Sequence, residues 1–280
     1  MHSLQRGAAV LSIESWDAMI VEDVMSINPM SIGPLEFVTR ARDIMRDYNF
    51  QSLPVVEEDG KVMGMITIQD VINVTSTKSD VTVNGYIRQD VPTISPSTDI
   101  AKAASVIINT EEGRLPVVDE DSRLIGVLSI VDIFEAIDEL KIVDEPVSKY
   151  MTSRVIVCEP DDPISRVWLN MIEYDITGFP VVRKNQEVMG MITREDIMKR
   201  GYVRIERESE GTHKKPPANV QHIMSTPAIT VDENDSIKKV ASIFKERHIG
   251  RVPVTRDNKL TGIVDRYDVI RACRRPMSIE

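Results

Sequence analysis

The heptapeptide GMITIQD at residues 64–70 decides the fold, because close variants of it return three times along the chain. Each copy has a glycine, then two apolar residues, then a polar residue, with an aspartate six positions after the glycine. The later copies read GVLSIVD at 126–132, GMITRED at 190–196 and GIVDRYD at 262–268. Such repetition indicates a chain built from four copies of one structural unit.

The residues before each heptapeptide repeat as well. A proline-containing motif precedes each copy, reading SLPVV at 52–56, RLPVV at 114–118, GFPVV at 178–182 and RVPVT at 251–255. The proline-to-glycine distance is ten residues in the first three copies (54 to 64, 116 to 126, 180 to 190) and nine in the fourth (253 to 262). Further upstream, each unit has an opening segment such as VEDVMSINP, followed by an amphipathic run. In the last run, Ile237, Val240, Ala241 and Phe244 recur at helical spacing, which predicts one apolar helix face.

One unit therefore reads as an opening segment, a helix, two strands and a second helix. The sequence predicts a strand through LPVVEE, a turn at EDGK, a strand through VMGMIT and a helix beginning near IQDVIN. We divide the chain into an N-terminal extension (1–20), four repeats (21–75, 83–140, 147–201 and 220–275) and a charged linker (202–219). A unit of about 55 residues has a marginal core. We therefore expect repeat 1 to pair with repeat 2, and repeat 3 with repeat 4.

Composition excludes several classes of protein. The 280-residue chain carries 34 Lys and Arg against 44 Asp and Glu, a net charge of -10, which disfavours nucleic acid and anionic membranes as partners. Cys158 and Cys273 form no CxxC pair and the four histidines have no metal-ligand spacing, so we expect no metal site and a reducing, cytoplasmic location. Nucleophile-elbow, Walker A and Rossmann motifs are absent from the sequence, so we expect no enzyme activity.

The repeated unit resembles the cystathionine-beta-synthase (CBS) domain. Three features carry the resemblance: an opening similar to M-S-x-x-P, the LPVV strand, and the ending G-h-h-[ST]-x-x-D, where h is apolar. The resemblance extends over nearly all of residues 21–275. It implies an α/β fold in which each repeat has the order β-α-β-β-α. It also implies that two repeats associate through their sheets as a Bateman module and that two modules can assemble into a flat disc. It also implies an adenine nucleotide (AMP, ADP or ATP) bound between repeats. A chain of four such repeats is similar to the gamma subunits of AMP-activated protein kinase, which implies a protein partner that this chain regulates. Association of two copies of the chain into a homodimer is a further possibility.

The residues themselves support a polar ligand. A carboxylate can accept hydrogen bonds from both hydroxyls of a ribose, while a neighbouring hydroxyl and the free N–H groups at a helix start can bind a phosphate. The candidate pairs are Thr67 with Asp70, Ser129 with Asp132, and Thr193 with Asp196. A hydroxyl followed three positions later by an acidic residue is also an ordinary helix cap. The sequence leaves both interpretations open.

The fourth copy keeps a candidate nucleotide-binding carboxylate, Asp268, but has Asp265 in place of the hydroxyl residue, and this difference helps to separate the two interpretations. An aspartate caps a helix as well as a threonine does, whereas its charge would repel a phosphate. We therefore expect four capped helices, but only three sites well equipped for a phosphorylated ligand.

Arg114 and Arg251 hold matched positions at the start of the proline motifs of repeats 2 and 4, where repeats 1 and 3 have Ser52 and Gly178. In the kinase gamma subunits that the chain resembles, a basic residue here contacts ligand phosphates. We therefore include these four positions among the nucleotide-binding candidates. Those subunits often have histidine one position earlier, where this chain has glycine in repeats 2 and 4. The preference among mono-, di- and triphosphates therefore stays open.

Together these features predict a regulatory protein that senses adenine nucleotides and signals to a protein partner. Two alternatives stay open. One is a constitutive scaffold, or an accessory of a nucleotide-metabolising enzyme, whose clefts are vestigial. The other is a sensor of S-adenosylmethionine or a related nucleoside, because a ribose-binding aspartate would serve that ligand equally well.

Overall fold

The structure is a computed structural model, and it describes residues 19–48, 50–72, 74, 80–110, 113–137, 141–174, 176–199 and 218–273. The N-terminal extension up to residue 18 and the linker up to residue 217 lie outside the described residues.

Each repeat consists of two antiparallel strands with a helix before and after them. Repeat 1 has α2 (Val38–Tyr48), β2 (Ser52–Val56), β3 (Val62–Thr67) and α3 (Ile68–Ile72), after α1 (Val21–Val24) and β1 (Ser26–Ile27). Repeat 2 has α4 (Ile100–Thr110), β4 (Arg114–Val118), β5 (Leu124–Ser129) and α5 (Ile130–Ala136). Repeat 3 has α6 (Ile164–Glu173), β6 (Gly178–Val182), β7 (Val188–Thr193) and α7 (Arg194–Lys199). Repeat 4 has β8 (Val231–Asp232), α8 (Ile237–Arg247), β9 (Arg251–Arg256), β10 (Lys259–Asp265) and α9 (Arg266–Arg271).

The first strand of the predicted β-α-β-β-α order is very short. In repeat 4 it is β8, which pairs parallel to β9. In the other repeats it is one parallel bridge, which joins Ile32 to Val55, Ile94 to Val117 and Cys158 to Val181. The α/β architecture of four repeats is confirmed. The predicted apolar face of α8 is confirmed too, since Ile237, Val240, Ala241 and Phe244 are all fully buried.

Repeats pair by exchanging their opening segments. The opening segment of repeat 1 forms β1, which pairs with β5 of repeat 2 through Ser26 and Val127. In return, Arg88 in the opening segment of repeat 2 bridges to Met65 on β3 of repeat 1. Repeats 3 and 4 make the same exchange, in which Thr152 bridges to Ile263 and Ser225 bridges to Met191. Repeats 1 and 2 therefore form one module and repeats 3 and 4 the other, as expected.

The exchange explains why every heptapeptide begins with glycine. A Cβ atom on Gly126 would lie 2.6 Å from the Met25 sulfur, and one on Gly262 would lie 2.4 Å from the Met151 sulfur. At Gly64, where φ is +148°, a Cβ atom would lie 2.2 Å from the carbonyl oxygen of Arg88. The opening segment of the partner repeat thus lies directly against the glycine, and a side chain would push it away.

Replacing Gly64 with alanine should therefore destabilise the first module. We expect the Gly64→Ala variant to lose about 2 kcal/mol of unfolding free energy, because the added methyl group meets a backbone carbonyl and the backbone is left-handed. Gly85→Ala is the matched control, since a Cβ atom there meets nothing within 4 Å. Urea unfolding followed by circular dichroism measures both variants. Equal stabilities of the two would contradict the close approach.

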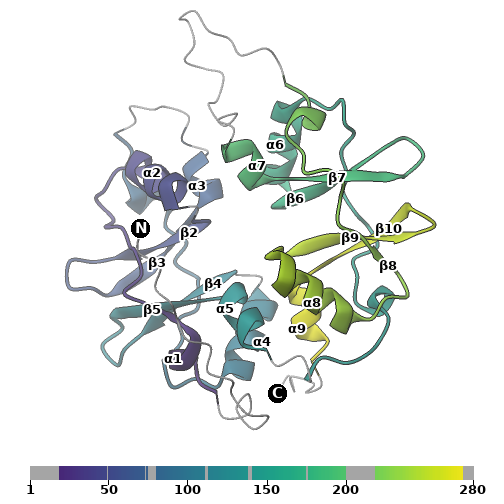
Figure 1. The fold of residues 1–280 in the computed structure, drawn as a ribbon. Helices are drawn as coiled ribbons and strands as arrows, with labels where there is room; N and C mark the ends of the chain where they lie inside the picture. Colours follow the sequence, from purple (N-terminus) through teal and green to yellow (C-terminus); the bar gives the residue numbers. More distant parts are fainter. Residues whose placement is uncertain are drawn as a thin grey trace, which may run out of the picture.

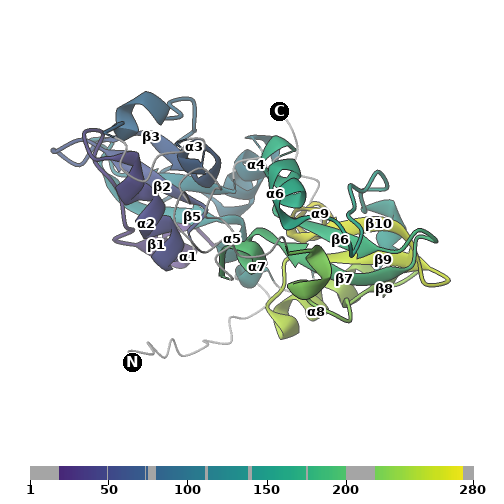
Figure 2. The same cartoon turned by 90° about the horizontal axis from the view of Figure 1, so that it is seen from above.

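The helices of the two modules meet in the centre of the molecule, with the hairpins pointing outward on both sides (Figures 1 and 2). One apolar cluster joins repeats 1 and 3, and a second joins repeats 2 and 4. In the second cluster, the rings of Phe134 and Phe244 lie 6.0 Å apart. Lys245 of repeat 4 also donates to the carbonyl of Ile137 in repeat 2 over 2.8 Å. The four repeats therefore form a ring, in which repeats 2 and 3 are diagonal to each other (Figure 1).

Candidate functional site

The predicted hydroxyl–carboxylate pairs of repeats 1 to 3 have nearly the same geometry. The hydroxyl donates to Oδ2 of the aspartate over 2.6 Å in each of the pairs Thr67–Asp70, Ser129–Asp132 and Thr193–Asp196. The backbone N–H of the same hydroxyl residue donates to that oxygen over 2.8–2.9 Å. The strands place the pairs alike, because each hydroxyl residue ends the second strand of its hairpin, where its register partner is Ser52, Arg114 or Gly178.

These bonds are the bonds of a helix cap. The N–H groups of Asp132 and Asp196 donate back to the hydroxyls over 3.2 and 3.1 Å, so the hydroxyl both donates and accepts within the chain. The helices that follow are short, with five residues in α3, seven in α5 and six in α7. A ligand of the site would therefore depend mainly on the second carboxylate oxygen, Oδ1, and on nearby cations.

The four aspartates differ at Oδ1. The Arg88 guanidinium lies 3.4 Å from Oδ1 of Asp70 and donates to its Oδ2 over 3.1 Å. Arg271 donates to Oδ1 of Asp268 over 3.0 Å. Within the described part of the chain, Oδ1 of Asp132 and Oδ1 of Asp196 have no hydrogen bond. Repeats 2 and 3 thus present a carboxylate oxygen that can accept from a ligand.

Arg114 is the register partner of Ser129 and interacts electrostatically with Asp132, but it forms no ion pair or hydrogen bond with that carboxylate. Its cation and this anion attract each other, but burial has the larger effect and lowers the pKa of the guanidinium. The guanidinium donates no hydrogen bond to any described residue, although its side chain is partly buried. An arginine in this state gains strongly from an anionic partner that fits its planar fork.

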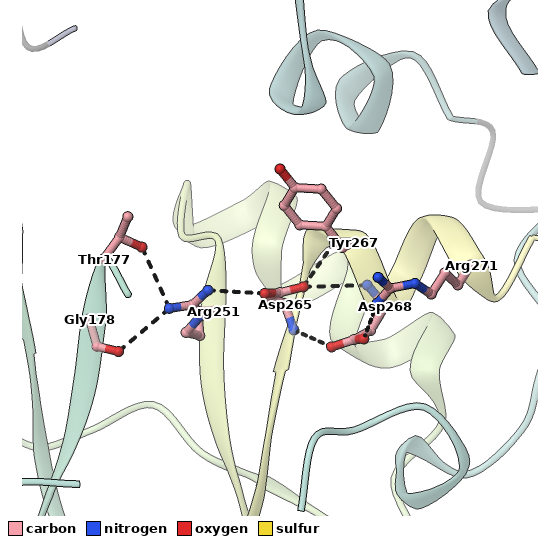
Figure 3. Close-up of polar contacts among 7 residues, drawn as sticks. All are labelled: Thr177, Gly178, Arg251, Asp265, Tyr267, Asp268 and Arg271. Carbon is pink, nitrogen blue, oxygen red and sulfur yellow. Dashed lines mark hydrogen bonds and ion pairs between the residues drawn. The ribbon is translucent and has the colours of Figure 1, made fainter. Parts of the chain in front are cut away.

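Arg251, the matched residue of repeat 4, already has partners (Figure 3). It faces Asp265 across the hairpin, and its Nη2 donates to Oδ2 of Asp265 over 3.0 Å. Its Nη1 lies 3.5 Å from the Thr177 hydroxyl and 3.5 Å from the Gly178 carbonyl, so it also bridges repeats 3 and 4. The two arginines were equivalent in the sequence, but their charges are available to different degrees.

Repeat 4 holds two carboxylates close together (Figure 3). Asp265 caps α9 by accepting from the N–H groups of Tyr267 and Asp268, as predicted for its capping role. Burial, and then the negative charge of Asp265, raise the pKa of Asp268 to about 6. Arg251 and Arg271 counter the two negative charges.

The sequence did not predict the residues that bond to the site carboxylates and to Arg251. They are Arg88 on Asp70, Arg271 on Asp268, and Thr177 beside Arg251. A signal for Arg88 was present, because it stands where the other opening segments have Ser26, Thr152 and Ser225.

Within the ranges that the structure describes, no three His, Cys, Asp or Glu side chains are arranged to hold a metal ion. Among the helices of these described ranges, none is long and apolar enough to span a membrane.

Comparison with known proteins gives a family match. A family model described as the CBS domain matches residues 21–76, 83–139, 147–202 and 220–275. The uncharacterized protein MJ1404 of Methanocaldococcus jannaschii is 30% identical over 259 residues, which are 90% of this chain and 61% of that protein. This chain therefore spans less than two thirds of that relative. The protein MJ1225 of the same organism is 25% identical over 268 residues, which are 86% of this chain and 94% of MJ1225.

Two crystal structures have a similar fold over most of the chain. The structure of MJ1225, for which homology to the gamma subunit of AMP-activated protein kinase has been suggested, has a TM-score of 0.74 at 24% identity. The similar region comprises 90% of this chain and 99% of the MJ1225 chain. A conserved protein from Pyrococcus horikoshii has a TM-score of 0.67 at 21% identity, with the same coverage. These similarities show the fold of four repeats in two modules.

Proposed function

Because the chain belongs to the CBS-domain family, we propose that it is a regulatory protein that binds an adenine nucleotide between its repeats and signals this occupancy to a protein partner. One observation carries the proposal: in repeat 2, Arg114 is the register partner of Ser129, its guanidinium interacts electrostatically with Asp132, and neither it nor Oδ1 of Asp132 has a hydrogen bond among the described residues. Asp132 offers an acceptor for ribose hydroxyls, and Arg114 offers a donor fork for a phosphate. A nucleoside monophosphate contains both partners in one molecule.

The energies suffice for physiological affinity. A hydrogen bond that involves a charged group contributes about 1.5–3 kcal/mol. Two or three such bonds, together with burial of the base, supply much of the roughly 8 kcal/mol that corresponds to micromolar affinity. Repeat 3 offers the carboxylate of Asp196, but Gly178 takes the place of the arginine. We therefore expect weaker phosphate preference there than in repeat 2.

Signalling requires that a ligand favours one arrangement of the repeats. Asp132 lies in the first turn of α5, and α5 packs against α9 of the other module. The end of α5 also receives the hydrogen bond from Lys245 to Ile137. A ligand held by Asp132 would thus act on a helix that joins the two modules. A partner that contacts both modules would then bind their two arrangements with different affinities.

S-adenosylmethionine or a related nucleoside is the second candidate ligand. The observation that favours it is that the Ser129 and Thr193 hydroxyls already donate within the chain, so they have no proton left for a phosphate. A thermal-shift series with AMP, ADP, ATP and S-adenosylmethionine separates the candidates. We expect AMP to raise the melting temperature most, because Arg114 can donate charged hydrogen bonds to its phosphate. A shift with S-adenosylmethionine alone would favour the second candidate, and no shift with any of the four would contradict ligand binding.

Arg114 should distinguish a phosphate from a nucleoside. We expect the Arg114→Gln variant to bind AMP about ten- to a hundredfold more weakly, because a charged hydrogen-bond partner is lost, while adenosine binding changes little. Arg40→Gln is the control for loss of one positive charge, and it should leave AMP binding unchanged because Arg40 is exposed and pairs with Glu36. Isothermal titration calorimetry measures both ligands. Equal losses for AMP and adenosine in Arg114→Gln would remove the phosphate assignment.

A further inference from the structure

Arg88 is the residue of the first module that sets repeat 1 apart. In each pair of repeats, the opening segment of one repeat lies beside the second hairpin strand of the other. Ser26, Thr152 and Ser225 occupy this place next to repeats 2, 4 and 3. Arg88 occupies it next to repeat 1, and its backbone exchanges two hydrogen bonds of 2.8 and 3.1 Å with Met65. The backbone position is therefore shared by all four repeats, and only the side chain differs.

The long side chain of Arg88 reaches the site of repeat 1. Its Nε donates to Oδ2 of Asp70 over 3.1 Å, and its Nη2 lies 3.4 Å from Oδ1. The same Nη2 donates to the side-chain oxygen of Gln69 over 3.1 Å. The Asp70 side chain is 19% exposed, and the guanidinium holds both of its oxygens in a bidentate arrangement. The carboxylate of repeat 1 therefore already has a cationic partner within the chain.

A serine in the opening segment leaves the facing carboxylate uncommitted. Ser26 lies beside repeat 2 and Ser225 beside repeat 3. In these two repeats, Oδ1 of Asp132 and Oδ1 of Asp196 have no hydrogen bond among the described residues. Neutral ribose hydroxyls would have to displace a guanidinium to reach Asp70, whereas they meet no such competitor at the other two aspartates.

We propose that Arg88 is an intrachain counter-ion that closes the site of repeat 1, so that nucleotide is taken up by repeats 2 and 3. The inference rests on the proposed function and adds which copies take part. Repeat 4 is opposed separately, by the charge of Asp265 and by the bond between Arg271 and Asp268. The open repeats lie on a diagonal of the ring, one in each module (Figure 1). Each module thereby has one ligand site and one site held by its own side chains.

The Arg88→Ser variant tests the proposal by gain of a site. Serine is the residue at the matched positions 26 and 225, and the backbone bonds to Met65 do not depend on the side chain. Equilibrium dialysis with radiolabelled AMP counts the bound nucleotides. We expect two AMP molecules per chain for the unchanged protein and three for Arg88→Ser. Adding Asp70→Asn to Arg88→Ser should return the count to two, and Asp70→Asn alone should leave it at two.

Arg40→Gln is the control for loss of one positive charge, because Arg40 is exposed on α2 and pairs only with Glu36 among the described residues. We expect two bound AMP molecules for it. A third AMP molecule on the unchanged protein that is lost in Asp70→Asn, or two AMP molecules on Arg88→Ser, would overturn the role of Arg88 and leave the proposed function standing. A count that falls in Arg88→Ser would show that Arg88 binds the nucleotide instead. No AMP on the unchanged protein would overturn the proposed function itself, and the counter-ion role with it.

Discussion

Replacing Asp132 or Asp196 with asparagine should remove one bound nucleotide per chain in each case. The carboxylate has two tasks, since Oδ2 accepts from the preceding residue and Oδ1 is available to the ligand. Asparagine has one acceptor oxygen only, so it cannot cap the helix and accept from a ribose hydroxyl at the same time. Loss of a charged hydrogen bond predicts a decrease in affinity of about ten- to a hundredfold at the changed site. Titration calorimetry with AMP measures affinity and stoichiometry together.

A matched control distinguishes this loss from general destabilisation. Asp43→Asn removes an exposed carboxylate of α2 that pairs with Arg46 and is bonded to none of the site residues, and this variant should bind AMP normally. Urea unfolding of the three variants should show a small loss of stability for Asp132→Asn and Asp196→Asn, as expected for a weakened cap. Unchanged affinity and stoichiometry in both site variants would return these aspartates to a purely capping role.

Asp265→Ser should create a phosphate-binding site in repeat 4. The carboxylate now binds Arg251 and would oppose a phosphate nearby. Two like unit charges about 4 Å apart repel by about 4 kcal/mol at an effective dielectric constant of 20, and partial exposure reduces this. Even a third of that value corresponds to about tenfold in affinity. Serine keeps the helix cap, removes the repulsion and frees Arg251 for the ligand. Arg271 still donates to Oδ1 of Asp268 in this variant, so we expect one additional AMP molecule per chain by equilibrium dialysis when Arg271→Gln accompanies Asp265→Ser.

Adding Arg251→Gln to these two substitutions is the control, because the resulting variant keeps the serine cap and lacks the freed cation. It should lose the additional AMP molecule. Asp265→Ser by itself should lower the pKa of Asp268 from about 6, since the charge of Asp265 is, after burial, a cause of its elevation. Ionised Asp268 costs stability above this pKa, so Asp265→Ser should stabilise the protein most at neutral pH. A structure of the unchanged protein with a nucleotide phosphate directly against Asp265 would contradict this account of repeat 4.

Local elements could be predicted from the sequence because their signals are local. The spacing of Ile237, Val240, Ala241 and Phe244 placed the buried face of α8 correctly. The proline motif coincides with the first hairpin strand, and the heptapeptide covers the end of the second strand and the start of the helix after it. The exchange of opening segments was not predicted, because a two-residue strand such as β1 has no periodicity and its partner lies in another repeat. The apolar clusters that join repeats across modules were missed for the same reason.

The sites were predictable as residue types and positions, but the ion pairs at them were not. Arg114 and Arg251 are equivalent in a sequence alignment of the repeats. The hairpin register makes them different, because Arg114 faces Ser129 whereas Arg251 faces Asp265. Arg88 lies 18 residues from Asp70, in the opening segment of a different repeat, so only the exchange between repeats reveals their contact. Charge balance at each site thus depends on the tertiary structure.

Uptake of AMP by the unchanged protein tests the central claim most directly. Equilibrium dialysis with radiolabelled AMP counts bound ligand without relying on a heat or a shift in stability. The account predicts saturable binding of two AMP molecules per chain, each lost separately in Asp132→Asn and in Asp196→Asn. Absence of bound AMP at millimolar concentration, from a protein shown to be folded by circular dichroism, would contradict it.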